Sequence, residues 1–242
     1  MATATLTQPV QRKAFKRTFL RDVTAKVTFA ETDLLGNGTA ISSFLRERFG
    51  ISDDFNLPKL DGIDIVSDSK SEKYNFTTTS ATVIMDSTIY RYFEDSLKPR
   101  LDVIISFLQA LGIDEVKTLS IKKRNLFQAT AKNAFQVWKI ALLEAFKVDN
   151  IRGMAETSNI PTKPFKMSIE GSADTEWGEI RVPFTVDVPD KSSFKFQLDL
   201  EAISKPIQVS EIINRGVQMN NDIFVSFTDI ISDKQINLMQ QD

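Results

Sequence analysis

The sequence predicts an α+β fold in which an antiparallel sheet, or more than one, carries long amphipathic helices packed on one face. Three observations lead to this prediction. Apolar and polar residues alternate over stretches in both halves of the chain, other stretches repeat apolar residues every three or four positions, and a group of strands precedes a long helix in each half. The third observation also favours two pseudo-repeated strand-strand-strand-helix halves.

The first predicted elements are a strand and a short helix. Residues 23–29 alternate apolar side chains with threonine and lysine, which is typical of a strand that is buried on one face. A short helix follows at 39–48, where Thr39 or Ser42 can cap its start and Gly50 ends it.

A loop and two more strands come next. Residues 52–61 contain Asp, Asn and Pro and predict a loop. Strands are predicted at 63–66 and 74–89, with a polar turn at 67–71 between them. Because the second strand is unusually long, we expect it to bend or to carry a bulge.

The clearest helix covers residues 90–111, where apolar residues recur every three or four positions up to Gly112. Pro99 is expected near its first turns or at a bend. A strand at 116–125 and a second amphipathic helix at 129–146 follow.

The last hundred residues repeat this order of elements. Three strands precede a helix at 209–231 and a short final helix that Ser232 can cap. The segment 189–192 predicts a turn, because Pro189 restricts φ and Asp190 can accept a local hydrogen bond. The three strands lie at 163–172, 179–188 and 194–203.

The chain divides into a basic arm at 1–22 and two α+β halves at 23–150 and 151–242, which we expect to form one compact unit. The arm is basic because its first 21 residues include Lys and Arg but no Asp or Glu. We interpret it as a terminus that leads into the first strand. A segment that contacts nucleic acid and a targeting sequence are the alternatives.

The composition excludes several classes of function. The 242 residues include no Cys and no His, which removes disulfides, thiolate nucleophiles, catalytic triads with histidine and zinc sites built from these residues. No apolar run approaches the roughly 18 residues needed to span a bilayer, so we expect no membrane protein. The net charge is −2. We expect neither a cofactor nor a metal ion.

Two features are candidates for binding. The densest basic group after the arm lies near the end of a predicted strand. It could contact phosphates, but the chain is net acidic and no aromatic residues are interleaved with the group. We therefore favour a solvated strand end. Trp177 lies in a predicted turn, either as an anchor for a partner protein or folded back on the sheet. The basic group is Lys122, Lys123, Arg124 and Asn125.

Several motifs resemble a sporadically distributed bacterial protein family of unknown function. They are the run from Met85 to Glu94, where a strand ends in Thr-Ile-Tyr before a helix, the strand at 119–127, and the closing segments 198–200 and 227–232. The chain departs from the family at its start, where a basic extension displaces the usual opening strand. The resemblance implies a bacterial, cytoplasmic protein of accessory or defence genes, and it supplies no catalytic residue.

The order of strands and helices also resembles that of secretion chaperones of the SecB kind, at the level of the fold alone. The sequence therefore favours a non-catalytic protein that binds or assembles with another protein, and the resemblance to the bacterial family implies an accessory component of a bacterial defence or toxin-related system. A homo-oligomer is a further expectation, and nucleic acid is the less favoured partner. The residues expected to bind are Tyr90, Lys122, Lys123, Arg124, Asn125 and Trp177.

An enzyme is the alternative interpretation. Asp187 and Asp199 lie on the polar side of predicted strands, where solvated acidic residues are the ordinary expectation. If they instead bound Mg²⁺ or Mn²⁺, the chain would be an Asp-based, metal-dependent hydrolase or nuclease. We favour the binding protein, because no pair of Asp, Glu, Lys or Tyr residues stands out as a general acid and base.

Overall fold

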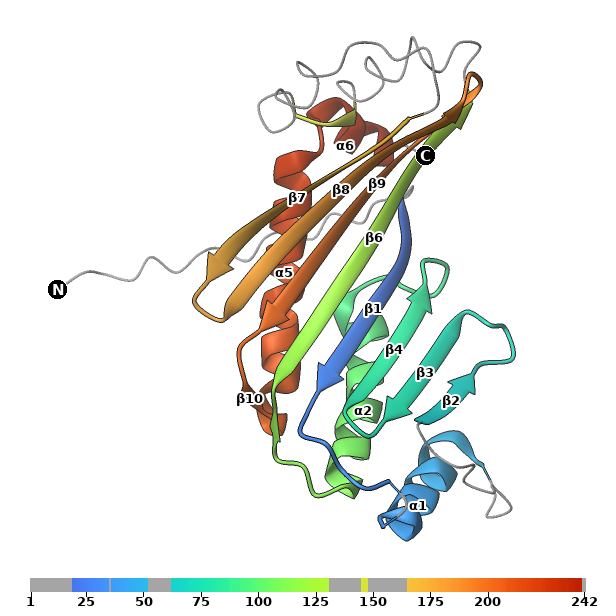
Figure 1. Ribbon diagram of the computed structural model, residues 1–242, viewed down its shortest axis with the longest axis vertical. Coiled ribbons are helices and arrows are strands. Elements are labelled where there is room, and N and C mark those ends of the chain that lie inside the picture. The colour runs from blue at the N-terminus through green and yellow to red at the C-terminus, as the bar shows by residue number, and fades with distance from the viewer. Residues whose placement is uncertain (1–18, 35, 52–61, 131–144, 148–164, 241–242) are drawn as a thin grey trace, which may run out of the picture.

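The computed structural model describes residues 19–34, 36–51, 62–130, 145–147 and 165–240. Its centre is a sheet of eight strands: β1 (Leu20–Thr28), β2 (Gly62–Val66), β3 (Glu72–Thr77), β4 (Ser80–Asp86), β6 (Thr118–Thr130), β7 (Phe165–Thr175), β8 (Gly178–Asp190) and β9 (Ser193–Ser204). Neighbouring strands are antiparallel throughout, in the order β2-β3-β4-β1-β6-β9-β8-β7 (Figure 1). The short strands β5 (Glu115–Val116) and β10 (Ile207–Gln208) pair separately.

The strand order of the sheet is symmetrical about its centre, with four strands on each side. The strand order is β2-β3-β4-β1 from one edge and β7-β8-β9-β6 from the other, and β1 and β6 pair at the centre. The second group of four includes β6, whose residues precede position 151. The two halves therefore share one continuous sheet.

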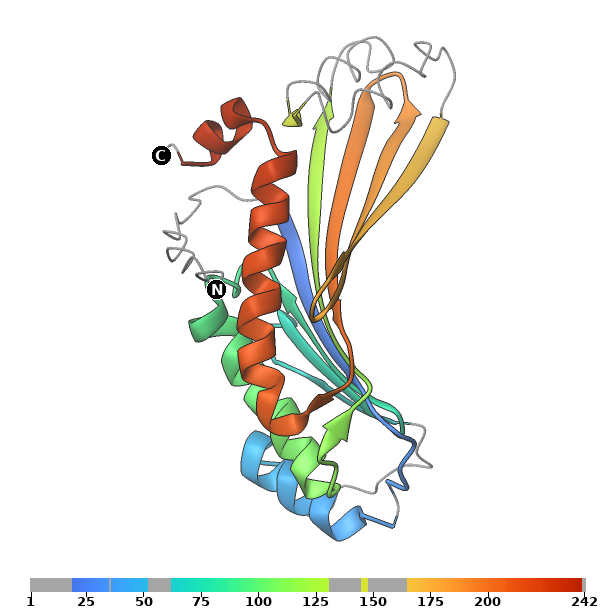
Figure 2. The same ribbon diagram turned by 90° about the vertical axis from the view of Figure 1, so that its left-hand side faces the viewer.

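The helices of the described residues are α1 (Gly38–Phe49), α2 (Lys98–Ala110), α5 (Ile212–Ile230) and α6 (Asp233–Gln240). Figure 2 shows α1, α2 and α5 on the same side of the sheet. Helix α5 contacts β6 and β9, while α2 contacts β4 and packs against α1. The predicted α+β class, with helices on one face of an antiparallel sheet, is confirmed.

Local signals in the sequence place several ends of these elements, although α1 begins at Gly38, so that the expected caps Thr39 and Ser42 lie inside the helix. Gly50 ends α1 in the left-handed conformation with φ 66°, and its N–H donates to the carbonyl of Arg46. The hydroxyl of Ser232 accepts the N–H of Gln235 at 3.2 Å and caps α6. The carboxylate of Asp190 accepts the N–H of Ser192 at 2.7 Å, which closes the β8–β9 turn as predicted.

The long strand predicted at 74–89 is wrong, because the chain reverses in its middle to form the β3–β4 hairpin. The hydroxyl of Thr77 accepts the N–H of Ser80 at 3.0 Å and so closes a turn of threonines that contains neither Gly nor Pro. The four polar residues 77–80 interrupt the alternation, but threonine is common within strands, so without Gly or Pro the segment is interpreted as one strand.

The helix predicted at 90–111 starts later, with one turn of π-helix, η1 (Phe93–Leu97), before α2. Pro99 lies in the first turn of α2 and has no N–H to donate to the preceding turn. The N–H of Lys98 bonds instead to the carbonyl of Phe93, five residues earlier. Pro99 therefore accompanies the change from π- to α-helix, near the first turns as expected.

Each half of the sheet has its own cluster of phenylalanine rings between the strands and the helices. In the first half, the ring centroid of Phe107 on α2 lies 4.4 Å from that of Phe76 on β3 and 5.5 Å from that of Phe44 on α1. In the second half, Phe146 lies 5.0 Å from Phe184 on β8. These rings are buried and contribute much of the apolar area that stabilises the fold.

Several predictions concern residues outside the described part of the chain. They are the loop at 52–61, the central part of the helix at 129–146, and the arm at 1–22 up to residue 18. Within the described residues, none of the helices has both the length and the apolar character required to cross a membrane.

Candidate binding surface

The side of the sheet without helices carries polar side chains at its centre, and we call it the open face. Because side chains alternate along a strand, Lys122 and Arg124 on β6 lie on the open face, whereas Lys123 and Asn125 lie on the helix side. The basic group of the sequence is therefore divided between two environments.

The two open-face cations of this group each contact a carboxylate. The ammonium of Lys122 lies 2.9 Å from Oδ2 of Asp199, and Nε of Arg124 donates to Oδ2 of Asp22 at 2.9 Å. Asp199 also accepts a hydrogen bond from Gln197 at 3.1 Å, and its side chain is only 7% exposed. Since positive and negative charges are paired locally, the geometry favours a solvated strand end over a phosphate-binding patch.

The two carboxylates that a hydrolase would need do not converge. Asp187 on β8 lies opposite Lys195 on β9, four residues along the strand from Asp199, which corresponds to roughly 14 Å. Asp199 is already bonded to Lys122 and Gln197. Among the described residues, no three acidic side chains are grouped so that they could hold a metal ion.

Tyr90 lies between the sheet and helix α5, in a buried polar cluster. Its hydroxyl donates to Oδ1 of Asn220 on α5 at 2.9 Å, and the ammonium of Lys123 lies 5.1 Å from the centroid of its ring. Asn125 is also buried, and its amide donates to the carbonyl of Leu198 at 3.2 Å. Both residues were expected to bind another protein, and in the structure their side chains are buried and bonded within the chain.

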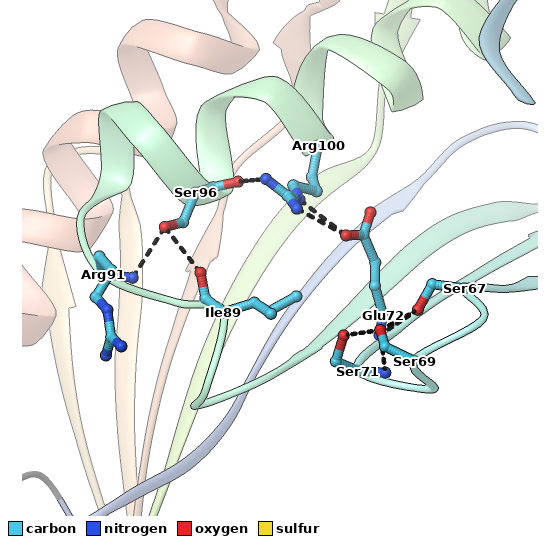
Figure 3. A network of polar contacts seen from close by, with 8 residues as sticks. All are labelled: Ser67, Ser69, Ser71, Glu72, Ile89, Arg91, Ser96 and Arg100. Carbon is cyan, nitrogen blue, oxygen red and sulfur yellow. Dashed lines mark hydrogen bonds and ion pairs between the residues drawn. The ribbon is translucent and has the colours of Figure 1, made fainter.

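A network of hydrogen bonds holds the chain on both sides of Tyr90 (Figure 3). The hydroxyl of Ser96 accepts the N–H of Arg91 at 2.9 Å and donates to the carbonyl of Ile89 at 3.3 Å. Arg100 on α2 donates to the carbonyl of Ser96 and, at 2.7 Å, to the carboxylate of Glu72 on β3. The corner between β4 and α2 is therefore fixed to the sheet, and its polar groups serve the fold.

Asp86 closes the turn before this corner and makes the stability of the protein sensitive to acid. Its carboxylate accepts the N–H of Thr88 at 2.8 Å, and this hydrogen bond holds the pKa of Asp86 below its ordinary value. A carboxyl group with a lowered pKa in the folded state stabilises that state above its unfolded pKa, about 3.9 for Asp. This contribution is lost as the pH falls through the lower pKa of the folded state.

We therefore expect Asp86→Asn to reduce the acid sensitivity of unfolding below about pH 4, because asparagine still accepts the N–H of Thr88 but does not titrate. The measurement is urea unfolding of both proteins between neutral and acidic pH, together with an NMR titration of the Asp86 carboxyl carbon. An Asp86 pKa at or above the ordinary value would contradict the assignment.

Trp177 is folded back on the protein, which is the second of the two arrangements that the sequence leaves open. Its side chain is 4% exposed, and its indole N–H donates to the carboxylate of Asp222 on α5 at 2.9 Å. The close approach continues at the next residue, because a Cβ on Gly178 would lie 1.9 Å from the carbonyl oxygen of Ile203. Trp177 thus joins the β7–β8 turn to α5.

The surface that the sequence does not reveal is the outer edge of β7, at one end of the described sheet. This strand has eleven residues, and no described strand pairs with its outer side. Residues 168–174 are exposed, and they include Ile169, a large apolar side chain with 41% exposure. Alternation identifies β7 as a strand, but only the strand order of the sheet places it at an edge.

Comparison of the chain with models of protein families and with curated proteins finds no match.

Proposed function

We propose that the protein is a non-catalytic binding or assembly protein, which holds another polypeptide by main-chain pairing at the edge of β7. The observation that supports the proposal is an eleven-residue edge strand with no described strand on its outer side. Strands in globular proteins usually have about five or six residues, and exposed edges are commonly short or covered. At the opposite edge, β2 has only five residues.

The register of the β7–β8 hairpin indicates which main-chain groups are available. Thr175 and Gly178 pair on either side of a two-residue turn, where the flanking pair exchanges hydrogen bonds. Every second residue of β7 from Thr175 therefore bonds to β8. Pro183, which has no N–H, lies opposite Glu170, as expected for a pair that exchanges no hydrogen bond.

The remaining residues of β7 direct their N–H and C=O groups away from β8, and we call them the outward residues. An extended chain that pairs with them would add a ninth strand to the sheet. Its affinity would come from the main chain, and its selectivity from side chains on the open face. The outward residues are Lys166, Ser168, Glu170, Ser172 and Asp174.

The experiment compares two substitutions at one outward residue. Ser168→Pro removes a single outward N–H and leaves the main-chain bonds to β8 in place, whereas Ser168→Ala keeps the N–H. Both variants lose the contact between the hydroxyls of Ser168 and Thr185, so this loss does not distinguish them. Loss of a main-chain hydrogen bond is expected to weaken partner binding about tenfold in the proline variant, with little change in the alanine variant. Thermal unfolding of both variants verifies that the fold is retained.

Hydrogen exchange of the full chain locates the bound strand. If the protein pairs with itself, the amides of the outward residues should exchange slowly in the purified protein. If it pairs with another protein, these amides should exchange slowly only after a partner purified from the native host is added. Fast exchange of these amides in both samples would contradict the proposal. Binding of a partner with equal affinity to the proline and alanine variants would contradict it as well.

A further inference from the structure

We infer that the strand that pairs with β7 is β7 of a second copy of this chain, antiparallel to the first and related to it by a two-fold axis at Ser168. This inference rests on the proposed function and names its partner. The two sheets would join into one sheet of sixteen strands with the helices of both copies on the same side. Such a contact is closed and symmetric, as is usual for homodimers.

The charges of the outward residues support this register. With the axis at Ser168, Lys166 of one copy lies opposite Glu170 of the other, and the symmetry forms this pair twice. The side chains of these residues share the open face, since they lie opposite Asp187 and Pro183 of β8. Charged residues on an edge strand ordinarily oppose pairing, but these two attract each other when they lie directly opposite.

Other two-fold registers fit less well. An axis at Glu170 places Lys166 opposite Asp174 twice but also sets the two copies of the Glu170 carboxylate opposite each other, and an axis at Ser172 places Glu170 opposite Asp174 twice. An axis at Ile169 leaves Lys166 opposite Ser172, without a charged partner. The axis at Ser168 pairs opposite charges and brings no like charges together. Pairing of β7 would also cover Ile169, which is 41% exposed in the single chain.

A charge-swap series tests the inference on the full chain by sedimentation equilibrium. Lys166→Glu and Glu170→Lys each convert two attractive pairs into two repulsive ones, and each should raise the dimer dissociation constant about tenfold or more. The double variant restores attraction in both pairs and should return the constant to near the wild-type value. Lys166→Glu also places a second carboxylate opposite Asp187 within each chain, and this effect is the same in the single and the double variant. Recovery of the dissociation constant in the double variant therefore reports on the contact between copies.

A cysteine substitution tests the register. The chain has no Cys, so Ser168→Cys introduces a single thiol. Residues that exchange hydrogen bonds across antiparallel strands have Cα atoms about 5.5 Å apart, a distance that a disulfide spans. We expect Ser168→Cys to form a covalent dimer on mild oxidation. The matched control is Ser172→Cys, whose thiols would be separated by eight residue spacings, roughly 27 Å.

The outcomes separate this inference from the proposed function. A protein that stays monomeric across the micromolar range overturns self-pairing, yet outward amides protected by a different partner would still support binding at β7. A dimer insensitive to the charge swaps overturns the inference, because the copies then meet elsewhere. A covalent dimer of the Ser172→Cys variant in place of the Ser168→Cys variant overturns the register.

Discussion

Replacing Phe107 with alanine is expected to lower the free energy of unfolding by about 3 to 5 kcal/mol. Phe107 is completely buried on α2, and its ring contacts those of Phe29, Phe44 and Phe76. Alanine would remove this contact between α1, α2, β3 and the residue that follows β1, and would leave a cavity that the surrounding elements fill only in part. Urea unfolding followed by far-UV circular dichroism measures the loss.

The same experiment tests whether the two halves unfold together. Trp177 belongs to the half at 151–242, whereas Phe107 belongs to the half at 23–150, and replacing Trp138 of that first half with phenylalanine leaves Trp177 as the only tryptophan. Because β1 and β6 join the halves in one sheet, tryptophan emission should shift to lower urea by the same amount as circular dichroism. An unchanged emission transition would show that the halves unfold separately. Val225→Ala, at a site 40% exposed on α5, is the control and should change the unfolding free energy by no more than about 0.5 kcal/mol.

The sequence predicts most strands and helices because their signals are local. Alternation over residues 194–203 and the turn at Asp190 are enough to place β9 and the hairpin before it, since both depend on neighbours in the chain. The β3–β4 turn escapes prediction because its local signal is ambiguous. Its defining contact is made by the hydroxyl of Thr77, and Thr is equally common within strands.

The candidate site is less predictable because it depends on which strands become neighbours. Lys122 and Lys123 are adjacent on a strand, so their side chains lie on opposite faces of the sheet. Only the packing of α5 decides that the face of Lys123 is the covered one. The partners of Tyr90 and Trp177 lie on α5, 130 and 45 residues further along the chain. The edge position of β7 is likewise a property of the whole sheet.

The contact between Lys122 and Asp199 is the second site where a large effect is expected. The side chain of Asp199 is 7% exposed. Among the ion pairs of the described residues, Lys122 is the only cation within 4 Å of its carboxylate. Lys122→Met keeps most of the apolar stem of the side chain and removes the charge, so that a nearly buried carboxylate loses its counter-ion. We expect a loss of about 2 to 3 kcal/mol in the free energy of unfolding, below the value for a fully buried pair because Lys122 is 37% exposed.

A double-mutant cycle separates the pair from its surroundings. Asp199→Asn removes the opposite charge, keeps an acceptor for Gln197 and leaves Lys122 free to reach solvent, so its cost should be smaller, about 1 kcal/mol. Combined with Lys122→Met, it removes the unpaired buried charge, and the double variant should be more stable than Lys122→Met alone. Strictly additive losses would mean that the two groups do not interact. Because the pair joins β6 to β9 on the open face, coupling would show that this ion pair contributes to holding the two strands together.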